Sequence, residues 1–316
     1  MINPVYLYAS DDPETVRSPG RLLTASISST EPCRLYFDHV NGSPTRLRIV
    51  LVLRNATAGD ASVTFVDGLG GPAYDFMAVG HAATKRFLIN RDQDATSQRA
   101  VAGGGAVVLS DLILAPLECV CGVWELSTDS DAPLDLVVLA LNIGDDPVAL
   151  CTTIAACAPD RSNRKGKYDI SQVADLALTY TVGSAQADFA IGDATYPNVI
   201  VDPLVPDPQP LKGEYAIVRH ANVAIVNPTS SLARVALAVS PRGGSATGTY
   251  KINGHWLETP SAPAGAYYRL MTFPLAAGAR GEIELITAAE LNSSYPVVFR
   301  VALDRSNLAS IPVSQC

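Results

Sequence analysis

Basic residues, aromatic residues and long apolar runs are all scarce in this chain of 316 residues. Lysine and arginine total 23 against 31 acidic residues, which gives a net charge of −8. Nucleic-acid binding depends on basic patches that displace counterions, so we expect no nucleic-acid partner. No stretch approaches the roughly 18 apolar residues of a membrane-spanning helix, so we also expect no membrane span.

Histidine is scarce too, with only four in the chain, and this limits metal and catalytic sites. Zinc sites usually combine Cys-x-x-Cys pairs with clustered histidines, and neither pattern occurs, so we expect no metal ligands. The Gly-x-Ser-x-Gly elbow of the α/β-hydrolases is also missing. The sequence therefore offers no catalytic residue, and it favours a protein that is not an enzyme.

The six cysteines are an even number, as in exported disulfide proteins, but they are thinly spread. Cys151 and Cys157 lie close in sequence, and we predict a disulfide that closes a small loop between them. Cys119 and Cys121 lie two residues apart, so on a strand both side chains point to one face. They are either buried thiols or partners in two separate bridges.

The hydrophobic patterning is β throughout. Short segments rich in β-branched residues are punctuated by many of the 23 glycines and 22 prolines. Helix candidates are limited to Ser171–Leu178 and Thr287–Leu291. An alternating strand must bury one face against a second sheet, so the pattern predicts an all-β fold of antiparallel β-sandwiches. The strand-like segments are 46–53, 62–66, 107–114, 235–239 and 282–286.

An internal match organises the chain. Residues 52–66 align with residues 224–238, and both contain a strand, an Asn-x-Thr turn and a second strand. The match resumes between 105–115 and 265–275. We predict two tandem, internally related domains. The first covers residues 1–144, a connector covers 145–168, and the second domain covers 169–316.

The stretch 65–88 (FVDGLGGPAYDFMAVGHAATKRFL) holds a glycine cluster and a histidine. A dinucleotide-binding loop would have to open a helix, but Pro72 and the non-periodic residues after it favour a glycine turn instead. His81 is the best single candidate for an active polar group. Asp75 and Asp67 lie near it in sequence, so a hydrolase site in residues 67–87 is one hypothesis.

Aromatic residues suggest a second kind of site, because carbohydrate-binding sandwiches expose aromatic platforms for stacking. Trp256 follows a turn, and Tyr267 and Tyr268 lie beside Arg269. Consecutive strand residues face opposite sides, so one of the two tyrosines should be buried. Trp124 has the surroundings of a core residue.

Acidic turn residues raise the question of calcium, which binds through oxygen ligands. Such residues are more often simply solvated, so we expect no cofactor and keep calcium as the one alternative. The pairs concerned are Asp11 with Asp12, Asp129 with Asp131, and Asp145 with Asp146.

Several stretches resemble an uncharacterised, exported domain-of-unknown-function family that is best represented in cyanobacteria. The likeness lies in residues 213–218 (GEYAIV), 223–229 (VAIVNPT) and 263–269 (PAGAYYR), with 35–40 and 47–57 in the first half. The resemblance implies tandem β-domains and export, and it implies no catalytic residue.

The leading hypothesis is a non-enzymatic structural or adhesive protein, secreted or in the cell envelope. Its partner would be a second copy or a component of the envelope or extracellular matrix. The segment Ile2–Ala9 could add a strand to a neighbour. It shows neither the basic start nor the apolar body of a signal peptide. The alternatives are a carbohydrate-binding module, with Trp256, Tyr267 and Tyr268 as contacts, and the hydrolase.

Overall fold

The computed structural model describes residues 3–160, 164–196, 198–200, 209–304 and 308–316. Strands hold 55% of the residues and helices 7%, so the predicted all-β class is confirmed. Neither segment that we considered for a helix is helical: Ser171–Leu178 runs from a turn into the strand β12 (Leu176–Thr181), and Thr287–Leu291 begins at the end of the strand β22 (Arg280–Ala288).

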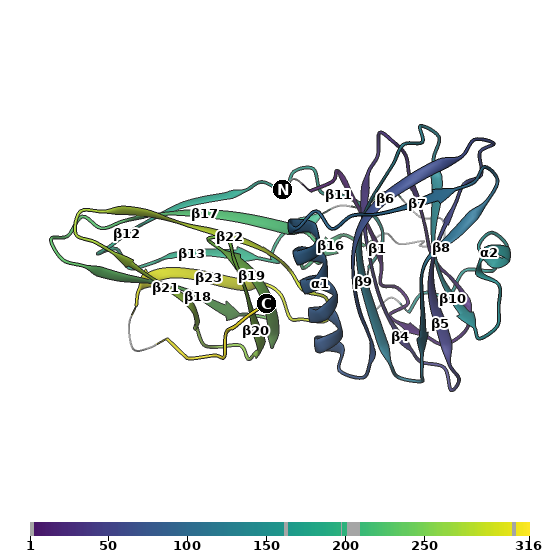
Figure 1. Cartoon of the computed structure of the whole chain (residues 1–316). Coiled ribbons are helices and arrows are strands. Elements are labelled where there is room, and N and C mark those ends of the chain that lie inside the picture. The colour runs from purple at the N-terminus through teal and green to yellow at the C-terminus, as the bar shows by residue number, and fades with distance from the viewer. Residues whose placement is uncertain (1–2, 161–163, 197, 201–208, 305–307) are drawn as a thin grey trace. The chain divides into compact units, whose positions relative to one another are not determined.

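The chain forms two compact units, each with its own sheets (Figure 1). Unit 1 consists of Met1–Gln172 and Tyr196–Leu211, and unit 2 of Val173–Thr195 and Lys212–Cys316. This division differs from the expected connector at 145–168. Residues 165–169 form a strand that pairs with the first strand of the chain, so the expected connector is part of unit 1.

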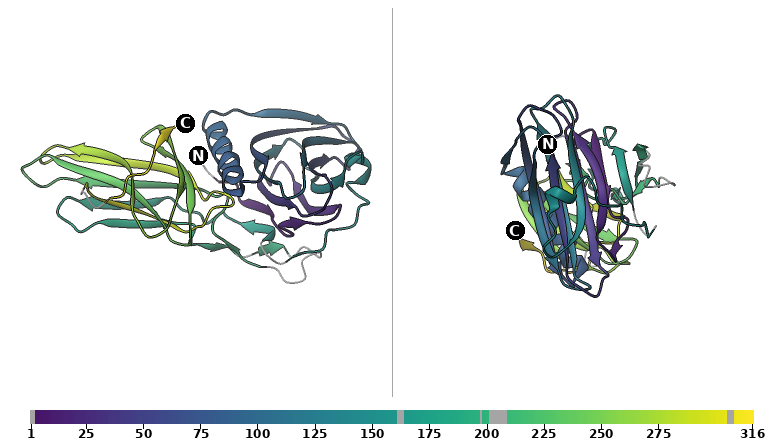
Figure 2. Two further views of the ribbon diagram at one scale, coloured as in Figure 1. Left: turned by 90° about the horizontal axis from the view of Figure 1, so that it is seen from below. Right: turned by 90° about the vertical axis from the view of Figure 1, so that its right-hand side faces the viewer.

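Unit 1 contains two sheets, seen as two layers in Figures 1 and 2. The larger sheet has the order β15 (Asn198–Ile200), β11 (Lys165–Asp169), β1 (Tyr6–Ser10), β4 (Cys33–Asn41), β9 (Cys119–Thr128), β6 (Ala61–Ala73) and β7 (Ser97–Val101), with β2 (Thr15–Val16) paired to β4. The smaller sheet has the order β3 (Gly20–Ile27), β10 (Leu134–Asn142), β5 (Leu47–Arg54) and β8 (Ala106–Leu114).

Unit 2 also contains two sheets. The larger has the order β12, β17 (Val218–Val226), β22, β19 (Ala246–Ile252), β20 (His255–Ala262) and β24 (Ser314–Gln315). The smaller has the order β13 (Ala187–Ile191), β23 (Val297–Leu303), β18 (Ala233–Pro241) and β21 (Tyr268–Leu275). A two-stranded sheet of β14 (Thr195–Tyr196) and β16 (Leu211–Lys212) lies where the chain passes from one unit to the other.

One strand order recurs in both units. The run β1-β4-β9-β6-β7 in unit 1 matches β12-β17-β22-β19-β20 in unit 2, and in each run the first two strands are parallel. The smaller sheets match in the same way. The sequence match does not follow this order. The sequence match aligns β5 with β17 and β6 with β18. In the strand order, however, β5 corresponds to β18.

A hydrophobic core fills the space between the two sheets of each unit. In unit 1 it includes Leu35 of the larger sheet, Val138 of the smaller one, and Trp124, which is 1% exposed. The prediction that Trp124 is a core residue is confirmed. In unit 2, Ile283 of the larger sheet and Phe299 of the smaller one belong to the same cluster. Alternating strand residues thus bury one face of each sheet.

Helix α1 (Phe76–Asp92) packs against the outer face of the larger sheet of unit 1 (Figures 1 and 2). The sequence predicted a glycine turn with no helix after it, and this prediction was wrong. Asp75 caps the helix by accepting a hydrogen bond from the Ala78 backbone N–H at 3.0 Å. The short helix α2 (Pro147–Leu150) lies beside β5 and β8 of the smaller sheet.

Two glycines explain why the helix can approach the sheet so closely. A Cβ atom on Gly70 would lie 2.0 Å from the carbonyl oxygen of Val79, and one on Gly68 would lie 2.2 Å from that of Ala83. Both glycines belong to β6, so the cluster is part of a strand beneath a helix rather than a turn.

The N-terminal strand is an interior strand. β1 pairs with β11 on one side and with β4 on the other. Both of its edges are therefore occupied, and the expected addition of Ile2–Ala9 to a neighbouring molecule does not fit this structure.

Candidate functional site

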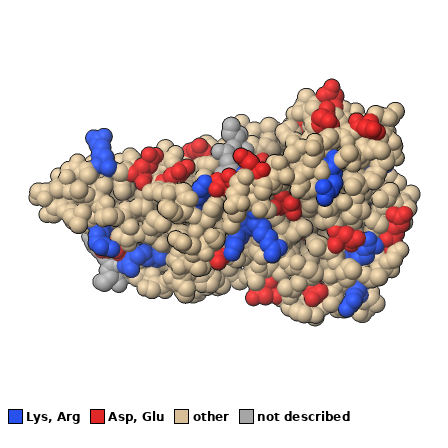
Figure 3. Space-filling model, viewed as in Figure 1, with Lys and Arg blue, Asp and Glu red and all other residues tan. Residues whose placement is uncertain are grey.

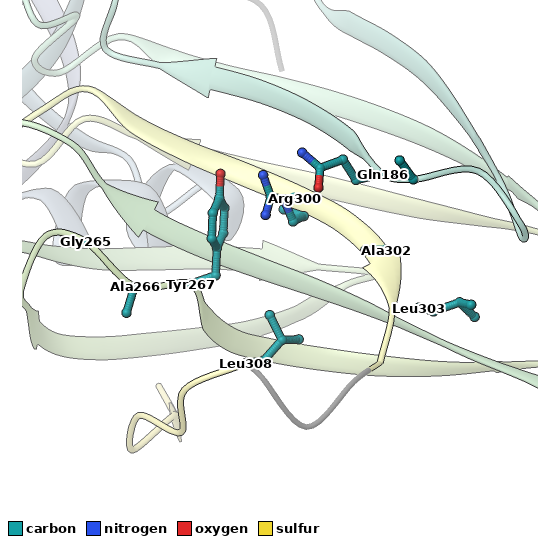
Figure 4. Close-up of a pocket in the computed structure, with 9 residues that line it drawn as sticks. Gln186, Gly265, Ala266, Tyr267, Arg300, Ala302, Leu303 and Leu308 are labelled. Carbon is teal, nitrogen blue, oxygen red and sulfur yellow. The ribbon is translucent and has the colours of Figure 1, made fainter.

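A hollow of about 340 Å³ in unit 2 brings together one aromatic and two long polar side chains (Figure 4). Its volume is at the lower end for small-molecule sites. Tyr267 precedes β21, Arg300 lies in β23, and Gln186 precedes β13. The lining residues are Ala185, Gln186, Gly265, Ala266, Tyr267, Arg300, Ala302, Leu303 and Leu308.

Arg300 is held rigidly at the centre of this hollow. It lies opposite Asp188 across the β13–β23 pair, and it donates from Nε (2.9 Å) and Nη2 (2.7 Å) to the two carboxylate oxygens. Its guanidinium also stacks on the Tyr267 ring, 3.8 Å from the ring centroid. The hydrogen bonds that Arg300 donates to Asp188 raise the pKa of Arg300, so the guanidinium stays charged.

A second arginine fixes the other end of the Tyr267 side chain. Arg242 donates from Nη2 to the Tyr267 hydroxyl at 2.6 Å. Arg242 is exposed, and no carboxylate of the described residues lies within ion-pair distance of it. An uncompensated cation therefore lies beside the hollow.

Gln186 completes the polar groups of the hollow. Its amide nitrogen donates to Asp188 at 2.8 Å, so the same carboxylate orients both Gln186 and Arg300. Figure 4 shows Gln186, Arg300 and Tyr267 in a row, with Leu303 and Leu308 on the apolar side. Such a surface presents a ring, planar hydrogen-bonding groups and an apolar wall to a small polar ligand.

The aromatic candidates from the sequence are divided by the structure. Tyr268 is buried in the core of unit 2, while Tyr267 is half-buried and lines the hollow, so the expectation that one of the two is buried is confirmed. Trp256 lies in β20, in the other sheet of the unit, with the Lys251 ammonium 6.0 Å from its ring centroid. Trp256 therefore does not share the hollow with Tyr267.

The sequence could not have identified Arg300 and Gln186. Tyr267 lies more than thirty residues from Arg300 and about eighty from Gln186, and no local motif connects the three. Only the strand register, which places Asp188 opposite Arg300, brings them together.

The candidate polar residues of segment 67–87 lie far apart, on strand β6 and along helix α1. Asp75 caps its first turn, whereas the backbone carbonyl of Asp67 accepts a hydrogen bond from Asn90 near the last turn. Fifteen residues of helix correspond to about 22 Å of rise, so Asp67 and Asp75 lie at opposite ends. His81 lies on the helix between them. The structure does not bring these three residues together as a catalytic group.

Four of the six carboxylates considered for calcium accept hydrogen bonds from backbone N–H groups. Asp129 accepts from the Ser62 N–H at 2.7 Å, Asp145 from the Asn142 N–H at 2.8 Å, and Asp146 caps α2. Asp12 accepts from the Asp160 N–H at 2.8 Å. Asp145 and Asp146 thus close a turn and cap a helix, whereas Asp12 and Asp129 bind backbone groups that are distant in the sequence.

The predicted disulfide is absent, and none of the six cysteines forms a disulfide bond. Cys151 belongs to the cluster outside the smaller sheet and donates to the Val148 carbonyl at 3.2 Å. Cys157 packs into the main core and donates to the Ser18 carbonyl at 3.7 Å. The two side chains enter different apolar clusters, so they do not meet.

Surface charge and helix character add two further observations. On the face shown in Figure 3, acidic and basic side chains are interspersed and neither sign forms a continuous patch. Neither helix among the described residues has the length and apolar character that a membrane crossing needs.

No protein-family model matches the chain, and no curated protein matches it significantly. Among solved structures, the chain is similar to Lac15 from a marine microbial metagenome, with 12% identity and a TM-score of 0.18 over 90% of this chain. It spans 55% of the length of that protein. It is also similar to the CBM22-1–CBM22-2 tandem of Paenibacillus barcinonensis Xyn10C, with 9% identity and a TM-score of 0.16 over 88% of this chain and 82% of that one. Similarities this low carry no functional argument.

Proposed function

We propose that this chain is a non-enzymatic adhesive protein of the cell envelope or extracellular space, and that it attaches to carbohydrate through the hollow around Tyr267. The observation that carries the proposal is the fixed row of Tyr267, Arg300 and Gln186 in one hollow. Saccharides present both apolar C–H faces and hydroxyl groups, so they suit a site that combines an aromatic ring with planar polar side chains.

Preorganisation supports a binding role. Asp188 holds both Arg300 and Gln186, and Arg242 holds the Tyr267 hydroxyl. Side chains that are already ordered lose little entropy when a ligand arrives. The uncompensated charge of Arg242 favours a saccharide that carries a carboxylate or sulfate group. Export is the implication of the family resemblance, and the recurring strand order supports the origin of the two units by duplication.

A glycan array followed by calorimetry tests the proposal, with acidic and neutral saccharides compared. We expect the Tyr267→Ala variant to bind at least tenfold more weakly than the wild type, which corresponds to about 1.4 kcal/mol. Tyr74→Ala is the matched control, because Tyr74 is an exposed tyrosine of unit 1 and its loss should leave binding unchanged.

Two results would count against the proposal. If the wild-type chain binds no saccharide on the array, carbohydrate attachment is wrong. If binding is found but survives Tyr267→Ala, the protein binds carbohydrate elsewhere, and the hollow is not the site.

A further inference from the structure

Three metal-ligating side chains meet on the larger sheet of unit 1, far in sequence from Tyr267. Asp38 of β4 lies directly opposite Cys121 of β9, and Cys119 lies two residues before Cys121 on the same face. All three are buried, with exposed fractions of 5% for Asp38 and 0% for each cysteine. Their potential ligand atoms all lie within 4.8 Å of one another.

The spacing of these atoms is that of a tetrahedral metal centre. With zinc–sulfur bonds of about 2.3 Å and zinc–oxygen bonds of about 2.0 Å, tetrahedral angles place two sulfurs about 3.8 Å apart and a sulfur and an oxygen about 3.5 Å apart. The two Sγ atoms lie 4.0 Å apart, and Cys119 Sγ lies 3.4 Å from Asp38 Oδ1. An ion could therefore be held with very small movements of the side chains.

A fourth acidic group lies close to this cluster. The Oδ1 atom of Asp11 is buried and has no hydrogen-bond partner, which is costly for a carboxylate oxygen. The Asp11 carboxylate lies near enough to Asp38 and Cys119 for their charges to interact. A divalent cation would offset the clustering of these acidic groups in a region shielded from water.

We propose that Asp38, Cys119 and Cys121 bind a zinc ion as a structural centre, and that the nearby Asp11 carboxylate moves in to complete it. Thiolate ligands select zinc over magnesium and calcium, and full burial fits a structural rather than a catalytic ion. Binding converts the two thiols to thiolates and releases both protons to the solvent. The affinity should therefore increase with pH. The proposal is independent of carbohydrate binding.

The sequence argued against a metal centre because it lacks a Cys-x-x-Cys pair. That spacing suits a tight turn, in which a chain curls around an ion. A Cys-x-Cys pair achieves the same convergence on a straight strand, because alternate residues share a face. The third ligand then comes from the neighbouring strand, at a position that no spacing in the sequence reveals.

The metal content of the full-length chain tests the proposal. The chain is unfolded, refolded with zinc, passed through a chelator column, and analysed by elemental mass spectrometry. We expect one retained zinc per chain. Asp38→Asn and Cys121→Ser should lower the affinity at least 100-fold. Cys157→Ser is the matched control, because Cys157 is also a buried thiol of unit 1 but lies outside the cluster, and this variant should retain the ion.

A second measurement needs no variant. X-ray absorption at the zinc edge of the wild-type chain should show two sulfur neighbours at about 2.3 Å with oxygen neighbours at about 2.0 Å. A shell without sulfur overturns the proposal, as does a refolded wild-type chain that retains no zinc. An intact mass lighter by two hydrogen atoms, with Cys119 bonded to Cys121, also overturns it.

Discussion

The close approach of helix α1 to strand β6 gives the sharpest test of the fold, through the variant Gly70→Ala. The added Cβ would lie 2.0 Å from the Val79 carbonyl oxygen, whereas ordinary contacts begin at 3.4 Å. The helix would have to rise by about 1.4 Å, the difference between these distances. The clashing oxygen belongs to the backbone, so it cannot move away by a rotamer change as a side-chain atom could.

The cost follows from what the helix would lose. Phe87 and Leu88 are buried on the face of α1 that meets the sheet, and a lifted helix leaves both underpacked. Overpacking of a core costs about 1–3 kcal/mol, and a clash with backbone belongs at the upper end. We therefore expect Gly70→Ala to lower the free energy of unfolding of unit 1 by about 3 kcal/mol.

Urea unfolding followed by tryptophan fluorescence measures this change. A Trp256→Phe background leaves Trp124, in the core of unit 1, as the only tryptophan, so the signal reports that unit. Gly59→Ala is the control, because nothing lies within 4 Å of its added Cβ, and it should change stability by less than about 0.5 kcal/mol. Equal stability of the two variants would refute the close packing of α1 on β6.

Three further predictions concern ionisable groups. Burial raises the pKa of Glu125, but the charges of Arg34 and Arg91 outweigh it and leave the pKa below 4.5. The stability from this cluster is thus complete above about pH 5 and decreases as the pH falls further. Glu125→Gln should cost about 3 kcal/mol at pH 7 and reduce this acid dependence in urea titrations; an unchanged pH profile would argue against the pairing. Burial lowers the pKa of His39 from 6.5 to about 4. Between pH 6.5 and about 4 only the unfolded state takes up that proton, so the free energy of unfolding should fall by up to about 1.4 kcal/mol per pH unit in that window. His39→Gln should remove that slope, and a slope equal to wild type would contradict the burial. In native alkylation only Cys316 should react, and all six cysteines should react after denaturation without reductant; fewer adducts would reveal a disulfide.

The fold class was predictable from the sequence because its signals are local. Alternation of apolar and polar residues over a few positions identifies strands whatever their partners are, and it also placed Trp124 in the core. The same rule predicted that one of Tyr267 and Tyr268 is buried. These statements need only the period of a strand.

Features that depend on distant residues were not predictable. Helix α1 was missed because Pro72 and the non-periodic residues after it favoured a glycine turn, whereas Gly68 and Gly70 leave room for a helix that packs on the strand. Of the residues that line the hollow, the sequence named only Tyr267 as a candidate contact. Tyr267 is an aromatic residue in a turn, but Arg300 and Gln186 reach it only through the pairing of β13 with β23. The Asp38 cluster likewise depends on the register of two strands.

The internal match shows how a physical requirement can mislead a sequence comparison. Asn227 donates to the carbonyl of Leu275, the last residue of β21, at 3.0 Å. Asn41 makes the corresponding bond to Leu114, the last residue of β8, at 3.1 Å. The strands β8 and β21 hold the same place in the two units. Asn41 is therefore the counterpart of Asn227 that a duplication would leave.

The sequence instead paired Asn227 with Asn55, because both are followed by threonine two positions later. Asn55 closes a turn of the same type and donates to the Val101 carbonyl at 3.2 Å. Any strand exit that must satisfy a buried carbonyl favours asparagine, so the motif recurs wherever the turn recurs. An asparagine at the end of a strand therefore indicates the type of turn, and it does not indicate which strand has ended. The sequence match is therefore displaced by one strand. The hydrogen-bond partner of each asparagine identifies which strands of the two units correspond.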